Sequence, residues 1–210
     1  MSRDLGSGVD AAVDGSESGL VLGNESEFFR ESLLAAMEKR GVRASEQSEV
    51  YLTTLLNDHL RSAGAVGRLD EPFSVRLAKA MHNSGAERFE LLRTLGDDVL
   101  FASGFFAEHL ERRGLTDDYV TGMGQLAYGG AASALRCYAR EQTIFDELAA
   151  QFHRFVDLLR HVSDSLVTSA AITQGDFVRL YERWLRTGSE VLASTLLRAG
   201  MIPTARRVLS

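Results

Sequence analysis

The histidines are the residues of this chain with the widest chemical range, because an imidazole ring can bind a metal or move a proton near neutral pH. Di-iron helical bundles place a glutamate three residues before such a histidine, and zinc proteases use a His-Glu-x-x-His sequence. Neither spacing occurs at the five positions, which are His59, His82, His109, His153 and His161. We therefore predict no metal site and no catalytic histidine.

Two of these histidines share one side of an expected helix with an acid. His153, Asp157 and His161 follow one another at intervals of four residues, which places them on one flank. The apolar stripe of that helix is centred on Phe155 and Leu159. Because charged positions beside an apolar stripe usually face water, we expect this flank to be solvated rather than to bind a metal.

His59 differs from the others because it follows Leu52 and Leu56 on the apolar stripe of its helix. One interpretation is a buried histidine that is hydrogen-bonded to a neighbour, as buried polar groups generally are. The other interpretation is a histidine that binds a ligand or acts as a base. We favour the first and keep the second as the alternative.

A segment rich in glycine and alanine, residues 119–135, is the second unusual feature. Each glycine inside a helix costs about 1 kcal/mol relative to alanine, so this density needs a compensating contact. A neighbouring helix can supply it by close approach, and we expect the small residues 102–104 to form the matching surface. In the alternative, a flat apolar ligand lies against the bare backbone. The ligand-binding residues of that alternative are His59, Gly124 and Tyr128.

The acids and nucleophiles indicate no reaction. Asp97 and Asp98 follow Gly96, and we interpret them as the cap of a helix that restarts after a break at that glycine. Cys137 is the one cysteine, so it forms no disulfide within the chain, and it lies late in its expected helix. No Gly-x-Ser-x-Gly elbow occurs. The sequence leaves open whether the protein is an enzyme, favours that it is not, and indicates no cofactor.

The elements that position these residues are all expected to be helices. Apolar residues recur at intervals of three and four, most clearly from Phe145 to Val162, and no run alternates with the period of a strand. The two prolines, Pro72 and Pro203, suit helix ends. We predict an all-α fold, a single-domain bundle of seven to eight helices.

The beginning of the chain has a different composition. Residues 1–27 hold six acids against one arginine, which accounts for most of the net charge of −6 of the 210-residue chain. A segment rich in glycine, serine and aspartate buries too little apolar surface to offset its ordering entropy. We predict a flexible acidic leader at residues 1–26 and an all-helical domain at residues 27–210, with Asn24 capping a first helix from Glu25. Because the domain is almost neutral, we expect no binding to nucleic acid.

No segment is expected to enter a membrane. Residues 119–135 carry no formal charge, but they include four glycines and are shorter than the roughly 20 residues of a spanning helix. The first residues do not have the pattern of a signal peptide. Together with the single cysteine, these features predict a cytoplasmic protein.

Three stretches together resemble known sequences. They are residues 92–115 (LRTLGDDVLFASGFFAEHLERRGL), 119–135 (YVTGMGQLAYGGAASAL) and 180–200 (LYERWLRTGSEVLASTLLRAG). They resemble a family of uncharacterised, all-helical bacterial proteins over roughly residues 27–203. The resemblance implies a bacterial, cytoplasmic, single-domain helical protein, and it implies no activity, cofactor or site residue.

These observations predict a non-enzymatic helical module that acts through contacts with a protein partner or with itself, as a homodimer. The small-residue helix supports this prediction because it allows another helix to pack closely. The alternative is a helical bundle that binds a planar apolar ligand or a His-coordinated metal, with or without enzymatic activity.

Overall fold

The computed structural model describes residues 16–61, 70–136 and 143–204, and every regular element in these ranges is an α-helix. The helices are α1 (Ser16–Arg40), α2 (Glu46–Arg61), α3 (Phe73–His82), α4 (Gly85–Phe105), α5 (Ala107–Arg112), α6 (Asp117–Arg136), α7 (Ile144–Ala150), α8 (Phe152–Gln174), α9 (Phe177–Thr187) and α10 (Glu190–Arg198). The prediction of an all-α bundle is confirmed for these ranges. No helix in them has the length and apolar character that a membrane crossing requires.

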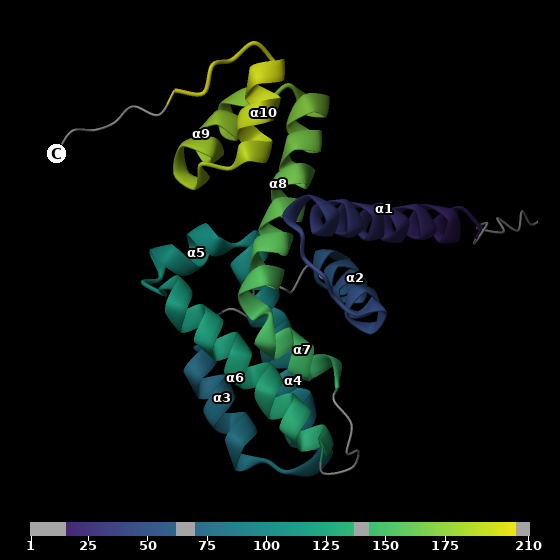
Figure 1. Ribbon diagram of the computed structural model, residues 1–210, viewed down its shortest axis with the longest axis vertical. Helices are drawn as coiled ribbons and strands as arrows, with labels where there is room; N and C mark the ends of the chain where they lie inside the picture. Colours follow the sequence, from purple (N-terminus) through teal and green to yellow (C-terminus); the bar gives the residue numbers. More distant parts are fainter. Residues whose placement is uncertain (1–15, 62–69, 137–142, 205–210) are drawn as a thin grey trace, which may run out of the picture.

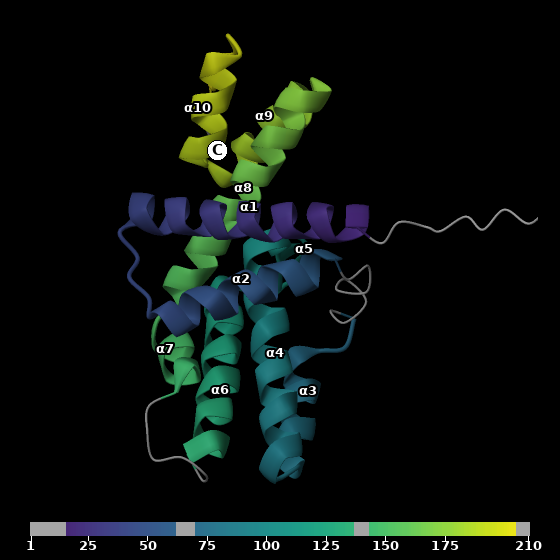
Figure 2. The ribbon, with the colours of Figure 1, turned by 90° about the vertical axis from the view of Figure 1, so that its right-hand side faces the viewer.

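Helix α8 connects the two ends of the molecule and packs against most of the other helices. In Figure 1 its lower end lies among α4, α6 and α7, and α9 and α10 lie beside its upper end. Helix α1 crosses α8 near its middle, and α2 runs beneath α1, as the turned view in Figure 2 also shows. The molecule therefore has a broad body, and a C-terminal arm (residues 165–204) that projects from it.

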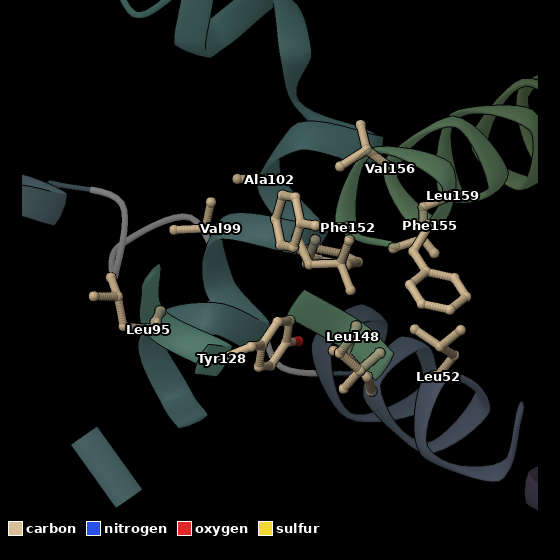
Figure 3. Packing of buried hydrophobic residues seen from close by; sticks show 14 of the residues in the cluster. Leu52, Leu95, Val99, Ala102, Tyr128, Leu148, Phe152, Phe155, Val156 and Leu159 are labelled. Atoms are coloured by element: carbon tan, nitrogen blue, oxygen red, sulfur yellow. The ribbon is translucent and has the colours of Figure 1, made fainter. Parts of the chain in front are cut away.

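The body is filled by its own side chains. Figure 3 shows the rings of Phe152 and Phe155 from α8 among aliphatic side chains that include Val99 of α4 and Leu52 of α2. A second, much smaller apolar cluster lies in the arm, where Ala171, Leu180, Leu192 and Leu196 are buried. Since burial of apolar area drives folding, most of the stabilising surface belongs to the body.

The ten described helices exceed the predicted seven to eight because the chain leaves the helical conformation at Phe106, at Gln151 and at Gly188. Gly188 adopts a left-handed conformation with φ of 62° and separates α9 from α10. Gln151 leaves the helical conformation between α7 and α8. Helix α8 then continues without a break to Gln174.

Two expected helix boundaries are wrong. Helix α1 begins at Ser16, so Asn24, the expected cap, lies inside the helix. Residues 1–15 lie outside the described residues, and the division into a leader and a domain stays a prediction. Helix α4 continues through Gly96, and the chain leaves the helix only at Phe106. The reason for this second difference lies in the contacts of Asp97 and Asp98.

Candidate functional site

Helices α4 and α6 approach closely at positions without side chains. A Cβ atom on Gly96 would lie 2.6 Å from the ring of Tyr128, and one on Gly130 would lie 2.9 Å from a leucine of α4. The expected close packing of the glycine-rich helix is therefore present. Residues 102–104 were expected to form the surface on which α6 packs. Gly104 instead packs against Leu159 of α8.

Asp97 lies in the middle of α4 and is 6% exposed. Its Oδ1 accepts hydrogen bonds from the hydroxyls of Tyr51, at 2.6 Å, and Tyr128, at 2.9 Å. Its Oδ2 accepts from Nη1 of Arg93 at 2.9 Å. Burial raises the pKa of Asp97, and it raises the pKa of both tyrosines, which keeps their hydroxyls protonated as donors.

Asp98 joins two further helices to α4. Its Oδ1 lies 3.0 Å from Nε2 of His59 in α2, and its Oδ2 accepts from Arg76 of α3 at 2.6 Å. The other ring nitrogen of His59 lies 2.9 Å from the backbone oxygen of Leu55. Both ring nitrogens thus face oxygen atoms of the protein. This arrangement leaves neither nitrogen directed toward a metal or a substrate.

These contacts define one unit, the Asp97–Asp98 network, which consists of Tyr51, His59, Arg76, Arg93, Asp97, Asp98 and Tyr128. It links α2, α3, α4 and α6 through charge-assisted hydrogen bonds, which are stronger than neutral ones. The interpretation of the two acids as a helix cap is wrong. Both acids lie inside a continuous helix. Their carboxylate oxygens face hydrogen-bond donors of tyrosine, histidine and arginine side chains, and so they do not need the free backbone N–H groups of a helix start as donors.

A small pocket of about 170 Å³ opens onto this network, between α2 and α4. Its lining includes Tyr51, Asp58 and His59 from α2, and Arg93 and Asp97 from α4. This volume is sufficient for a few water molecules and is below the range of about 300–1,000 Å³ that is typical of ligand pockets. The charged groups in its lining, such as Arg93 and Asp97, are already paired with each other.

The three residues of the alternative ligand site all contact other parts of the protein. His59 is 9% exposed and Tyr128 is fully buried, and the network brings both near the acid pair. The bare face of Gly124 is covered by the ring of Phe152 from α8. The interpretation of His59 as a hydrogen-bonded buried histidine therefore fits the geometry, and ligand binding by the three residues stays a prediction.

A larger opening, of about 930 Å³, lies between α5, α8 and α9, and the sequence analysis did not anticipate it. In Figure 1, α5 and α9 lie to the left of α8, which runs through the middle of the view. Its lining combines the aromatic residues Phe105 and Phe106 with arginines from several helices and with His161. We call this opening the α8–α9 cleft.

His161 corrects the expectation of a solvated flank on α8. His153 and Asp157 are exposed as expected, but His161 is only 8% exposed. Burial lowers its pKa, and the charges of Lys39 and Arg40 at the end of α1 lower it further. The approach of another helix end explains the burial, and the spacing within α8 cannot reveal such an approach.

The Nδ1 atom of His161 is also buried without a hydrogen-bond partner among the described residues. Most buried polar side-chain atoms have a partner, so an exception needs an explanation. No group of three or more metal-ligating side chains occurs in the described ranges.

Comparison with known proteins identifies no relative of this chain. No family model, no curated protein and no solved structure matches it. The resemblance to a family of uncharacterised bacterial proteins therefore stays a prediction, and the function has to be argued from the geometry alone.

Proposed function

We propose that the protein is a helical interaction module that pairs with a second copy of itself through the outer face of α6. The proposal rests on two glycines of α6 whose lack of a side chain serves no contact within one copy of the described chain. A Cβ atom on Gly122 or Gly129 would meet no described atom within 4 Å, whereas Gly124 and Gly130 of the same helix each contact a side chain of another helix.

The outward glycines have a cost that one copy of the chain does not compensate. Each interior glycine destabilises a helix by about 1 kcal/mol relative to alanine. Leu126 lies between them on the same face and is 62% exposed. The spacing of Gly122, Leu126 and Gly129 by four and three residues is that of a seam on which another helix packs. A second helix on this seam would bury the leucine and use the space above both glycines.

The seam is compatible with its own copy in the antiparallel direction. A two-fold axis that passes between Gln125 and Leu126 places Gly122 of one copy opposite Gly129 of the other. The same axis brings the first turn of α6, which carries Asp117 and Asp118, toward the last turn of the other copy, which carries Arg136. The two turns have opposite charges, but Asp117 and Arg136 also pair with Arg160 and Asp146 of their own copy, so the attraction adds only a small part of the binding free energy.

The expected dimer is weak. One pair of crossing helices buries less than the roughly 1,200–2,000 Å² of a standard stable interface. We therefore expect a dissociation constant in the micromolar range, about −8 kcal/mol of binding free energy, rather than in the nanomolar range.

Light scattering of the full chain over a range of protein concentrations tests the proposal. The expected mass rises toward that of two copies as the concentration increases, and Leu126→Glu keeps it at one copy. Val178→Glu on α9 is the matched control, since Val178 is 67% exposed and lies on another helix. A monomeric mass at every concentration, or an equal loss of dimer in both variants, contradicts the proposal.

The glycines allow a sharper test because the two readouts change in opposite directions. Gly122→Ala and Gly129→Ala should each stabilise the monomer by about 1 kcal/mol, measured by urea unfolding below the dissociation constant. The same substitutions should weaken the dimer, since a methyl group enters the space that the other helix occupies. Unchanged dimer affinity in both variants would show that the partner does not contact this face.

The bacterial origin, the cytoplasmic location and the lack of nucleic-acid binding stay predictions of the sequence. None of them is needed for the proposed pairing, which depends on α6 alone.

A further inference from the structure

The α8–α9 cleft has no part in the proposed pairing through α6. It is large enough for a small organic molecule, at about 930 Å³. Apolar side chains, among them Phe105, Phe106 and Val167, form part of its lining. Polar groups converge on it from α5, α8 and α9, which is the combination of apolar wall and few oriented polar groups that ligand sites have.

Two arginines of α9 present hydrogen-bond donors that the described residues do not use. Arg183 donates through Nε and Nη2 to Asp164 and Ser163, which leaves Nη1. Arg186 donates through Nε to Glu108 of α5, which leaves both terminal nitrogens. Each arginine is therefore held in position by an acid and still has guanidinium N–H groups for a further acceptor.

The acids of the lining do not cancel these donors. Asp164 and Glu108 already accept from the two arginines. Asp157, Glu111 and Glu182 also line the cleft, but all three are exposed to solvent, where water screens their charge.

His161 provides the independent second observation. It lines the same cleft, it is more than nine-tenths buried, and its Nδ1 has no partner among the described residues. A buried ring nitrogen without a partner is costly unless a bound molecule supplies its hydrogen bond.

We propose that the α8–α9 cleft binds a small organic anion, whose carboxylate or phosphate group accepts hydrogen bonds from His161, Arg183 and Arg186 and whose apolar part lies against Phe105 and Phe106. The bidentate geometry of guanidinium suits both oxyanions. The free protein holds His161 neutral near neutral pH, because burial and the charges of α1 lower its pKa.

Binding of an anion should therefore be coupled to uptake of a proton. The charged groups that act on His161 are Lys39 and Arg40 from α1, Asp164 from its own helix and Glu190 from α10. Arg183 reaches the same region from α9 through Asp164. An oxyanion adds a negative charge to this set, favours the imidazolium form and raises the pKa of His161. Affinity should consequently increase as the pH falls.

Nuclear magnetic resonance of the histidine ring nitrogens in the full chain tests the proposal directly. The compounds are phenyl phosphate and benzoate, with benzylamine as the cationic control. We expect one or both anions to shift the His161 ring signals and to raise its titration midpoint by about one pH unit, which corresponds to about tenfold tighter binding at low than at high pH. The stronger of the two anions identifies the oxyanion. An unchanged His161 ring with both anions, or an equal response to benzylamine, overturns the proposal.

Variants locate the binding in the cleft. His161→Phe keeps an aromatic ring at this position but removes both nitrogens. This variant and Arg186→Gln should each weaken binding of the anion by at least about tenfold. The reason is that each removes a charge-assisted hydrogen bond, which contributes about 1.5–3 kcal/mol. The controls are His153→Phe, on an exposed position of α8, and Arg179→Gln, whose side chain is 84% exposed at the rim. Full affinity in His161→Phe, or an equal loss in the controls, contradicts the assignment.

Discussion

Two histidines of this protein are buried to nearly the same extent and have opposite surroundings. His59 is 9% exposed and His161 is 8% exposed. Both nitrogens of His59 lie within 3.0 Å of protein oxygens, whereas Nδ1 of His161 has no partner among the described residues. Burial therefore does not distinguish a structural histidine from one available to a ligand. The two kinds of histidine differ instead in whether their ring nitrogens already have hydrogen-bond partners within the protein.

The regions around the two histidines differ in the same way. Around His59, the Asp97–Asp98 network pairs acids with tyrosines, arginines and the imidazole in the filled body. Around His161, the arginines keep unused donors beside a large opening at the base of the arm. A satisfied buried network makes a fold rigid and specific, whereas an unpaired buried polar group is costly. The following changes test this contrast, from the largest expected effect to the smallest.

Asp97→Ala should have the largest effect on stability. It leaves the hydroxyl of Tyr128 fully buried without its acceptor and removes the anion that Arg93 pairs with. We expect a loss of about 3 kcal/mol in the free energy of unfolding, measured in urea. Asp157→Ala in the lining of the cleft is the control and should change the free energy by less than about 0.5 kcal/mol. If Asp97→Ala and Asp157→Ala changed the free energy of unfolding equally, the network would not be more important for stability than the cleft.

Gly96→Ala tests the same network through its packing. The added methyl would lie 2.6 Å from the ring of Tyr128 and would force that ring away from Asp97. We expect a loss of about 2 kcal/mol in unfolding free energy, within the range for overpacking. Gly122→Ala on the outer face of the neighbouring helix should have the opposite sign in the monomer. A neutral Gly96→Ala would mean that the tyrosine contact is looser than the geometry indicates.

The same substitution at both histidines compares them directly. His59→Phe removes a donor from Asp98 and should cost about 2 kcal/mol of unfolding free energy, as for a hydrogen bond to a charged group. His161→Phe removes the buried Nδ1, which has no partner among the described residues, and should be neutral or stabilising by up to about 1 kcal/mol. The comparison fails if urea unfolding gives the two variants the same free energy.

The smallest expected effect is a pH dependence. The pKa of His161 is lowered in the folded state, so the unfolded chain binds a proton more readily. Stability should therefore fall as the pH falls below about 6.5, the ordinary value for histidine, by no more than about 1.4 kcal/mol per pH unit. His161→Phe should lack this part of the slope between about pH 5 and 7. The lowered pKa values of Asp146 and Glu147 act at more acidic pH and should be unaffected. Urea unfolding as a function of pH measures the difference.

Much of the fold was predictable from local patterns. Periodic apolar residues identified the helices. Ser45 precedes α2 and caps it in the way typical of serine, because its Oγ accepts a hydrogen bond from the backbone N–H of Ser48. The glycine-rich helix was also correctly interpreted as a close-packing element. Local patterns were misleading at Asp97 and Asp98, because the same two acids suit a helix cap and a buried network equally well until their partners are known.

By itself, the sequence determined that the described chain is helical, where most of its helices lie and that α6 carries unusual glycines, since these properties depend on neighbours a few residues away. Only the tertiary structure decided which acids are paired, which buried histidine nitrogens lack a partner among the described residues and where the cleft opens. Those properties arise from groups far apart in the chain, such as Tyr51 and Asp97, or Arg186 and Glu108, and no local spacing encodes their meeting.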